Sequence, residues 1–471
     1  MNLNDAYMMT IDGALTAGET TIDVINPATG AVFAAAPDCS KAQLDAAVEA
    51  AGRAFRTWRK TPIAERQALV AKAGDLLIAN ADEMARLLTR EQGRPVDAAK
   101  IEIARAGAWM KGVAELTPPV HVLEDSPVQL VEVRYMPLGV VCAIAPWNFP
   151  VSQSMWKAAP ALVAGNTVVL KPSPFTPLCT LKIGELFQSI FPPGVLNVIS
   201  GGDALGPMMT SHPGFAKISF TGSTATGKSV MESASKDLKR LTLELGGNDA
   251  AIVLPDVDLD AVAPKIFFGA FYNSAQICVA TKRLYVHEDI YDGLRDRLVA
   301  IANATKMGDG AEQGVMLGPI QNKRQFDRVM ALLDEARKSG LVLLQSAAPA
   351  TGGYFVPVTI VDNPPEDSRV VREEAFGPIL PMLKFSNIDD VIDRANASEY
   401  GLGGSVWSKD ADKAMEIARR METGTVWINQ NLSLRPDAPF AGHKHSGFGV
   451  ENGLEGLLEY MAPQAVHVAR S

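Results

Sequence analysis

Residues 218–229 read Ile-Ser-Phe-Thr-Gly-Ser-Thr-Ala-Thr-Gly-Lys-Ser, an apolar run followed by small residues and a polar segment. The apolar residues Ile218 to Phe220 are typical of the end of a strand, and residues 229–236 predict a helix. A strand, a small-residue turn and a helix N-terminus together form an anion site, because free backbone N–H groups and the helix dipole attract negative charge. The stretch therefore predicts a ligand that carries phosphate.

The same letters match the P-loop pattern of NTPases, G-x-x-x-x-G-K-[ST], from Gly222 to Ser229. An NTPase also needs a Mg²⁺-binding aspartate at the end of a neighbouring strand. Asp256 is only a loose candidate, because Pro255 stands where that strand should end. A P-loop NTPase is therefore the alternative against which the rest of the chain is weighed.

Strand and helix patterns alternate around this stretch and predict an α/β fold with a parallel, doubly wound sheet. Such sheets bind ligands at the carboxyl ends of their strands. Residues 146–148, 171–173 and 201–202 and the turn at Gly222 are expected at that edge. The predicted strands are 139–145, 167–170, 195–200, 216–220 and 241–245, and the helices between them begin near residues 150, 176, 203 and 226.

The flanking regions have different patterns. Residues 40–116 predict long amphipathic helices, at 63–90 and 95–116 among others, so the N-terminal part is expected to be mostly helical. Residues 251–431 predict a second α/β domain, with strands at 251–254, 283–287, 379–385, 404–407 and 425–429. Residues 128–135 alternate as a half-exposed edge strand does, and residues 466–469 are expected to pair with that strand of a neighbouring subunit.

Composition limits the class of ligand. The chain has 471 residues, a formal charge of −9 and no Lys/Arg run, which argues against nucleic acid or an anionic membrane as partner. The acidic first thirty residues do not resemble a signal peptide, and no stretch reaches eighteen apolar residues, so a cytoplasmic location is the expectation. Four widely spaced cysteines, with His443 and His445 as an incomplete ligand set, predict no bound metal.

Three segments carry candidate catalytic groups. Cys278 ends a loop of small and uncharged residues, where an exposed thiol can act as a nucleophile. Asn148 lies just past a strand and between two prolines, as an oxyanion donor would. Glu244 ends an apolar strand, where burial would raise its pKa and favour a role as base. Taken singly, each also fits an inert interpretation: a buried thiol, a turn-forming amide and a charge at a strand end.

Taken together, the motifs closely resemble the NAD(P)-dependent aldehyde dehydrogenase superfamily, in order and in rough spacing, over nearly the whole chain. The resemblance implies a Rossmann-type cofactor domain (1–116 and 138–246), a catalytic domain (247–448) and an oligomerisation element (117–137 and 449–471). It also implies a homodimer or homotetramer. The motifs are Asn148-Phe149-Pro150, Lys171-Pro172-Ser173, Phe220-Thr221-Gly222-Ser223-Thr224, Glu244-Leu245-Gly246-Gly247, Gln276-Ile277-Cys278, Glu373-Glu374-Ala375-Phe376-Gly377-Pro378 and Gly442-His443-Lys444-His445-Ser446-Gly447.

The resemblance also implies roles for single residues. Cys278 would attack the aldehyde, Asn148 would hold the oxyanion and Glu244 would activate the water that hydrolyses the thioester. A non-catalytic family member is disfavoured because all three are present. The implied cofactor residues are Trp147, Lys171, Ser173, Gly222, Ser223, Glu374 and Phe376. In this arrangement the turn at Gly222 receives the cofactor pyrophosphate and Lys228 is a solvated helix residue, which disfavours the NTPase.

Two details of specificity follow from positions relative to these motifs. Pro174 stands where many NAD-preferring members carry a glutamate, so NADP is expected to be accepted alongside NAD. The aldehyde tunnel is expected to be largely apolar, for a medium-sized aliphatic or aromatic aldehyde, although Arg435 leaves a semialdehyde open. The expected lining residues are Phe149, Gln153, Trp156, Ile277, Val279, Leu434 and Phe440.

Overall fold

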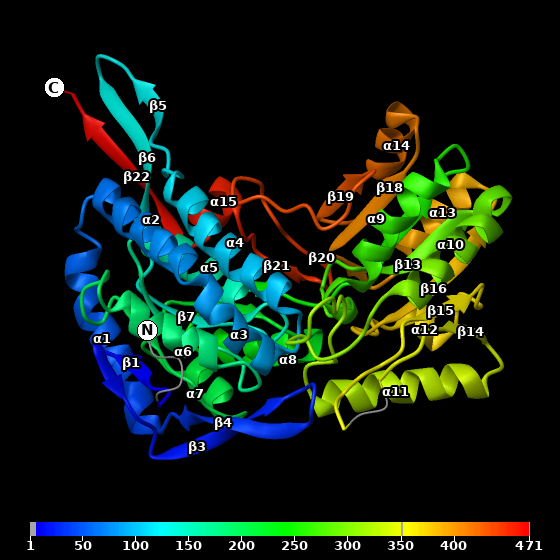
Figure 1. Ribbon diagram of the computed structural model, residues 1–471. Coiled ribbons are helices and arrows are strands. Elements are labelled where there is room, and N and C mark those ends of the chain that lie inside the picture. The colour runs from blue at the N-terminus through cyan, green and yellow to red at the C-terminus, as the bar shows by residue number, and fades with distance from the viewer. Residues whose placement is uncertain (1–5, 350–351, 471) are drawn as a thin grey trace.

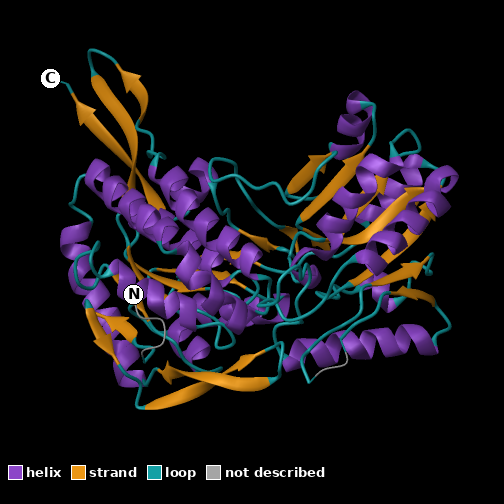
Figure 2. Cartoon of the chain, in the orientation of Figure 1, coloured by secondary structure: helices purple, strands orange, loops and turns teal. Residues whose placement is uncertain are grey.

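The computed structural model describes residues 6–349 and 352–470, so the very ends of the predicted ranges 1–116 and 449–471 lie outside the described residues. Two α/β bodies lie side by side, and a narrow three-stranded sheet projects from the first of them (Figure 1). Helices flank the strands in both bodies (Figure 2). The mixed α/β architecture predicted from the sequence is confirmed.

The first body is built on an eight-stranded sheet in the order β2-β1-β9-β8-β7-β10-β11-β21. Its parallel core, β9-β8-β7-β10-β11, is doubly wound, and the chain direction across the sheet reverses between β7 and β10. Ligands bind such sheets at this switch point. The strands are β1 (Met9–Ile11), β2 (Ala14–Thr16), β7 (Val140–Ile144), β8 (Thr167–Lys171), β9 (Leu196–Val198), β10 (Lys217–Thr221), β11 (Arg240–Glu244) and β21 (Gly447–Phe448).

Helices cover both faces of this sheet. The central helix α5 starts with Pro150 at its first position and ends at Gly165, whose φ of +96° is the left-handed value that glycine adopts without strain. Every residue of α5 except Ser152 is buried. The helices are α1 (Lys41–Trp58), α2 (Ile63–Ala79), α3 (Ala81–Gln92), α4 (Val96–Ala114), α5 (Pro150–Ala164), α6 (Leu178–Phe187), α7 (Leu205–Ser211), α8 (Thr224–Ser235) and α15 (Gly453–Leu458).

Two predictions for the N-terminal region are wrong. The helix expected over 63–90 is broken at Asn80, which ends α2 and precedes α3. The region also contains strands that were not predicted: β1 and β2 extend the first sheet, and β3 (Thr20–Asn26) pairs with β4 (Ala31–Asp38) as a two-stranded ribbon. The loop of this ribbon reaches the second body, where the backbone N–H of Tyr354 donates to the carbonyl of Pro27 at 2.9 Å.

The second body contains a seven-stranded sheet in the order β14-β15-β16-β13-β12-β18-β19, parallel except for β14. All five strands predicted here are present, and β14 and β15 were not predicted. The strands are β12 (Asp249–Val253), β13 (Thr281–His287), β14 (Val342–Gln345), β15 (Thr359–Asp362), β16 (Ile379–Phe385), β18 (Gly403–Trp407) and β19 (Thr425–Ile428); β17 (Tyr400–Gly401) pairs separately with β20 (His443–Lys444). The helices are α9 (Leu259–Phe271), α10 (Tyr291–Ala304), α11 (Lys323–Lys338), α12 (Arg369–Arg372), α13 (Ile388–Asn396) and α14 (Ala411–Ala418), with 3₁₀ turns at Tyr272–Ala275 and Glu288–Ile290.

The projecting sheet has the order β22-β6-β5, made of β5 (His121–Asp125), β6 (Gln129–Pro137) and β22 (Met461–Ala469). Two expectations for it are wrong. The C-terminal strand pairs with β6 of its own chain, from Met461 opposite Pro137 to Ala469 opposite Gln129. Strand β6 is therefore not an edge, because β5 and β22 satisfy the backbone groups on both of its sides. No helix within residues 6–349 and 352–470 has the length and apolar character needed to cross a membrane.

Candidate active site

The loop that carries Cys278 lies between α9 and β13 and is held in a strained conformation. Asn273, Ser274 and Ala275 have φ values of 54°, 53° and 60°, in the left-handed region that costs non-glycine residues about 1–3 kcal/mol each. Side-chain hydrogen bonds hold the loop in place. Ser274 Oγ donates to the carbonyl of Gly318 at 2.7 Å, and Gln276 Nε2 donates to the carbonyl of Asn273 at 2.9 Å. The position of the thiol is therefore fixed by its own loop.

Cys278 is half-buried at the end of this loop and has charged neighbours. Burial raises the pKa of its thiol to about 12, and the carboxyl groups of Asp249, Glu244 and Glu374 act in the same direction. The ammonium group of Lys282 is the neighbour that lowers this pKa. Because the thiolate is the reactive form, the cations and donors around Cys278 decide how readily it forms.

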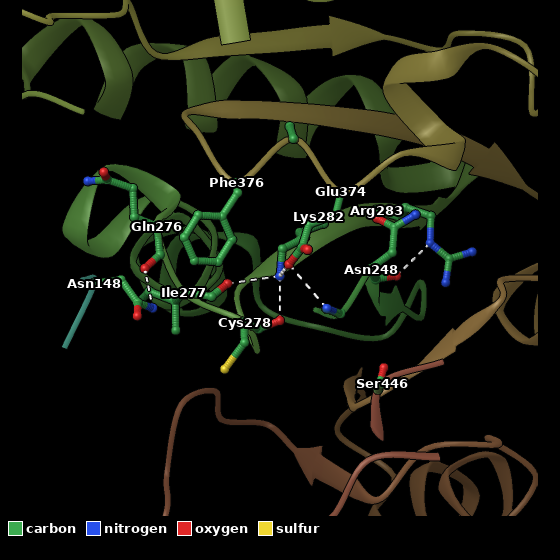
Figure 3. Close-up of polar contacts among 12 residues, drawn as sticks. Asn148, Asn248, Gln276, Ile277, Cys278, Lys282, Arg283, Glu374, Phe376 and Ser446 are labelled. Carbon is green, nitrogen blue, oxygen red and sulfur yellow. Dashed lines mark hydrogen bonds and ion pairs between the residues drawn. The ribbon is translucent and has the colours of Figure 1, made fainter. Parts of the chain in front are cut away.

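Asn148 faces the same loop from the first body. Its side-chain amide donates one N–H to the carbonyl of Gln276 at 2.9 Å (Figure 3), which leaves the second N–H for another acceptor. The backbone carbonyl of Asn148 accepts from Asn273 Nδ2 at 3.2 Å and from the guanidinium of Arg94. Arg94 is itself buried in an ion pair with Glu102. The loop after β7 is thus attached to the thiol loop of the second body, and no sequence motif indicated Arg94.

Glu244 ends β11 and is only 3% exposed. Neither of its carboxylate oxygens has a hydrogen-bond partner among the described residues. The pKa of Glu244 is raised well above its ordinary value, chiefly by burial and next by the negative charge of Glu451, while Lys157 opposes the shift. The raised pKa expected at this strand end is found, although the contribution of Glu451 was not anticipated.

Lys157 and Glu451 form a buried ion pair beside Glu244. Lys157 Nζ lies 2.5 Å from Glu451 Oε1 and also donates to Thr221 Oγ1 at 2.6 Å. Neither residue was predicted from the sequence. Lys157 lies among mostly apolar and small residues of α5, and a lysine is almost never fully buried without a partner, so this pattern could have indicated a buried ion pair.

A cavity of about 110 Å³ connects Cys278 and Asn148 to the surface. All seven residues expected to line an aldehyde tunnel lie around it. It is also lined by Ile101, Glu102, Arg105, Ser152, Tyr272 and Leu432, which were not predicted. Four aromatic rings and five aliphatic side chains dominate the wall. Arg435 is not part of this lining: it is exposed and makes two hydrogen bonds to Asp437, at 2.8 and 2.7 Å.

The turn between β10 and α8 lies at the switch point of the first sheet. Ser223 caps α8 by accepting from the backbone N–H of Thr226 at 3.3 Å, and the N–H of Gly222 donates to the carbonyl of Glu244 at 3.0 Å. Lys228 lies in the second turn of α8 and is exposed. The P-loop letters therefore place their lysine on a helix surface, away from the turn where a phosphate would sit.

The loop after β8 places Lys171 at the same edge of the sheet. Burial lowers the pKa of Lys171 to about 8, and the carboxyl groups of Asp203 and Asp38 oppose this shift. Ser173 is buried and its Oγ accepts from the backbone N–H of Phe175 at 3.3 Å, while Pro174 is half-exposed. Two side chains that can donate hydrogen bonds, Lys171 and Ser173, thus follow β8, with Asp203 as a nearby negative charge that the sequence did not indicate.

Residues of the second body complete the edge. The rings of Trp147 and Phe376 meet edge to face, with centroids 5.3 Å apart. Glu374 Oε1 accepts from the backbone N–H of Gly247 at 3.1 Å and lies 3.4 Å from Lys282 Nζ. A Cβ atom at Gly246 would overlap the Glu374 carboxylate, so a larger residue there would displace that side chain. The structure thus brings Trp147, Phe376 and Glu374 together between the two bodies.

Across the described ranges, no group of three or more His, Cys, Asp and Glu side chains is arranged to hold a metal ion. The histidines near the site have other contacts. His445 Nδ1 lies 2.9 Å from Glu399 Oε2, and His443 belongs to the short strand β20.

Comparisons with known proteins identify the family of this chain. The sequence profile of the aldehyde dehydrogenase family matches residues 15–466. An aldehyde dehydrogenase of Fusarium is 41% identical over 94% of this chain and 95% of its own. The phenylacetaldehyde dehydrogenase of Pseudomonas fluorescens is 38% identical over 96% of this chain and 93% of its own. A solved NAD⁺ complex of an aldehyde dehydrogenase from Bacillus cereus is 35% identical, has a TM-score of 0.94 and covers 100% of this chain and 98% of that one. This chain therefore belongs to the aldehyde dehydrogenase family, and it is an NAD(P)-dependent enzyme that oxidises an aldehyde to a carboxylic acid.

Proposed function

We propose that Cys278 is the nucleophile, that Asn148 stabilises the oxyanion and that Glu244 is the base for hydrolysis. The observation that carries the first two roles is the shared cavity, because Cys278 and Asn148 line it from two different bodies. Glu244 lies outside this lining, and its charge acts on the Cys278 thiol. The Cys278 thiolate adds to the aldehyde carbonyl, and the oxygen of the resulting thiohemiacetal accepts from the free N–H of Asn148 and the backbone N–H of Cys278. A preorganised donor of this kind typically contributes about 3–4 kcal/mol.

NAD(P)⁺, when bound, would supply the hydride acceptor for oxidation of the thiohemiacetal carbon, which becomes the thioester carbonyl on Cys278. The Gly222 turn, Lys171 and Glu374 are the groups that would hold this cofactor. They fit it chemically, since they supply backbone N–H groups and an ammonium for phosphate and hydroxyl oxygens, and a carboxylate that accepts from ribose hydroxyls. The overlap that a Cβ at Gly246 would cause with Glu374 fits a site built around that carboxylate.

Glu244 then takes a proton from water, and the water attacks the thioester to release the carboxylic acid and restore the thiol. The raised pKa of Glu244 makes its carboxylate a stronger base than an exposed glutamate. The proton that Glu244 accepts neutralises a buried carboxylate, and the adjacent Lys157 and Glu451 remain an ion pair.

We propose that the substrate is a medium-sized apolar aldehyde, aromatic or aliphatic. The cavity wall is dominated by apolar side chains, and Arg435 is engaged by Asp437 outside it. The similarity to a phenylacetaldehyde dehydrogenase supports an aromatic substrate. Arg105 lines the cavity but is exposed, and its guanidinium donates to the carbonyl of Leu434 at 3.0 Å.

A panel of phenylacetaldehyde, benzaldehyde, hexanal and succinate semialdehyde tests this proposal by kcat/KM. We expect the apolar aldehydes to exceed the semialdehyde by at least about tenfold, because an unpaired carboxylate in an apolar cavity loses hydration without gaining a partner. Trp156→Ala should raise KM for the aromatic aldehydes more than for hexanal. A hundredfold preference for the semialdehyde would reject the proposal of an apolar substrate. Arg105 would then be the candidate to bind the carboxylate of the semialdehyde.

We propose that the enzyme accepts NADP alongside NAD, because Pro174 carries no charge that would repel a 2′-phosphate. We expect kcat/KM for the two cofactors to lie within about a hundredfold, or 2.7 kcal/mol. Pro174→Glu should shift the ratio toward NAD and Asp203→Asn toward NADP, because Asp203 is one of the two carboxylates whose charge reaches Lys171. The proposed role of Pro174 is wrong if NADP supports no turnover, or if neither variant changes the ratio of kcat/KM for the two cofactors.

We also propose a homodimer or homotetramer in the cytoplasm. The projecting sheet exposes apolar side chains, including Val122, Leu123, Val128 and Val468, in a group that a partner subunit would cover. All four cysteines are free thiols, which suits a reducing compartment. Light scattering that gives the mass of one chain, 50.3 kDa, at micromolar concentration would refute the assembly.

A further inference from the structure

Lys282 is a buried lysine beneath the thiol loop that no step of the reaction uses. It lies at an irregularity of the second sheet, where Asp249 pairs with Thr281 but the next residue, Ala250, pairs with Arg283. Lys282 is thus the extra residue of a β-bulge between β12 and β13. Bulges redirect a side chain and are common beside active sites.

The ammonium group of Lys282 joins the nucleophile loop to the segment that carries Glu374. It donates to the carbonyl oxygen of Ile277 at 2.8 Å and to the carbonyl oxygen of Cys278 (Figure 3). It also lies 3.4 Å from Glu374 Oε1. The sulfur of Cys278 points away from Lys282 in this view, so the ammonium acts on the thiol through the backbone and through space.

The charges around Cys278 show why the cation of Lys282 affects formation of the thiolate. Three carboxyl groups, those of Asp249, Glu244 and Glu374, disfavour the thiolate, and Lys282 is the cation that opposes them. Two other cations near the cavity are held in buried ion pairs, Lys157 with Glu451 and Arg94 with Glu102, and Arg105 is exposed at the cavity wall. Asp249 is buried, and the charge of Lys282 and the backbone N–H of Gly403 favour its carboxylate form. Without Lys282, three carboxyl groups would act on the thiol and the cation that opposes them would be lost.

We propose that Lys282 is a positioning residue that fixes the carbonyl of Cys278 and the carboxylate of Glu374 relative to each other and favours formation of the Cys278 thiolate. The inference rests on the proposed role of Cys278 as nucleophile. It has two measurable parts: the ease with which the thiol ionises, and the affinity for the cofactor, whose ribose Glu374 would hold. A lysine that only stabilised the fold would change neither.

The test measures the rate of Cys278 alkylation by iodoacetamide against pH, in the full-length enzyme without aldehyde or cofactor, with Cys278→Ala as the background. Lys282→Met removes the charge and the donor, Lys282→Gln removes only the charge, and Lys282→Arg keeps both. We expect Met and Gln to lower the alkylation rate at pH 8 by about tenfold and to move its midpoint to higher pH, because an uncompensated carboxyl cluster disfavours the thiolate. Lys282→Arg should retain most of the wild-type rate.

Asp249→Asn supplies a reciprocal test, because removing one of the opposing charges should move the midpoint to lower pH. Lys228→Met is the control, since Lys228 is exposed on α8. NAD⁺ binding by calorimetry should weaken several-fold in Lys282→Met and stay unchanged in the control. If Lys282→Met does not fold, the Gln and Arg variants decide between charge and structure.

A wild-type alkylation profile in a folded Lys282→Gln enzyme would overturn the proposal. This failure differs from failure of the proposed function. If Cys278→Ala still oxidised aldehyde, the nucleophile itself would be wrong, whereas an unchanged alkylation profile in Lys282→Gln with an inactive Cys278→Ala would remove only the role of Lys282.

Discussion

Cys278→Ala should lower kcat/KM for aldehyde oxidation by at least about 10⁴-fold, because loss of a catalytic nucleophile leaves only binding and oxyanion stabilisation. No other thiol can replace it, since Cys39, Cys142 and Cys179 are buried and lie outside the cavity lining. Steady-state NADH formation, followed at 340 nm, measures the loss. Binding of NAD⁺ should persist, since none of the proposed cofactor contacts uses the sulfur.

The matched control is Cys39→Ala, which removes a buried thiol far from the site. Burial raises the pKa of Cys39 to about 12, as it does for Cys278, so a raised pKa alone does not distinguish the nucleophile. We expect this variant to keep wild-type kcat, with a modest loss of thermal stability from the small cavity. Activity above a hundredth of wild type in Cys278→Ala would reject a covalent mechanism at this residue.

Glu244→Gln should cause the second largest loss of turnover, and the loss should be confined to hydrolysis of the thioester. The amide keeps the shape of the side chain but cannot accept a proton from water, so the thioester forms and is not hydrolysed. Rapid mixing should show a burst of about one NADH per active site, followed by a steady rate lower by about 10²–10⁴-fold, the usual contribution of a general base. Intact-mass measurement during the stall should show the acyl group on the enzyme.

The pH dependence of this step has a definite sign. Burial, assisted by Glu451, raises the pKa of Glu244, so its carboxyl is neutral below that value and cannot act as a base. Deacylation in the wild-type enzyme should therefore rise as pH increases through the raised pKa, and the rise should vanish in Glu244→Gln. Glu232→Gln, on an exposed position of α8, should leave both phases unchanged. A wild-type steady rate in Glu244→Gln would show that another group activates the water.

Local patterns in the sequence were sufficient for most of the sheet strands. Strands such as β7 and β10 are short apolar runs bounded by turn residues, and their order along the chain alternates with helices, which requires a parallel sheet. The strands that were not predicted are different. Residues 31–38 are rich in alanine, so β4 carries little strand signal, and it exists because β3 pairs with it along seven positions.

The motif residues could be located from the resemblance to a known family. The residues that surround them in space could not. Each motif is a local pattern, so Cys278, Asn148 and Glu244 could be identified in the printed sequence. The groups that set their chemistry come from distant segments. Glu451 lies 294 residues from its partner Lys157 in the sequence, and no local pattern relates them.

The sequence by itself determined the α/β class, the parallel, doubly wound character of the first sheet's core and the positions of the candidate nucleophile, base and oxyanion donor, because these depend on periodicity and on short motifs. Only the tertiary structure decided which charges meet. It made β6 a central strand by bringing β22 back to it, and the bulge between β12 and β13 brought Lys282 under Cys278. The physical reason is that burial and Coulomb interactions depend on distances in space, and residues far apart in the chain fix those distances only when the two bodies pack together.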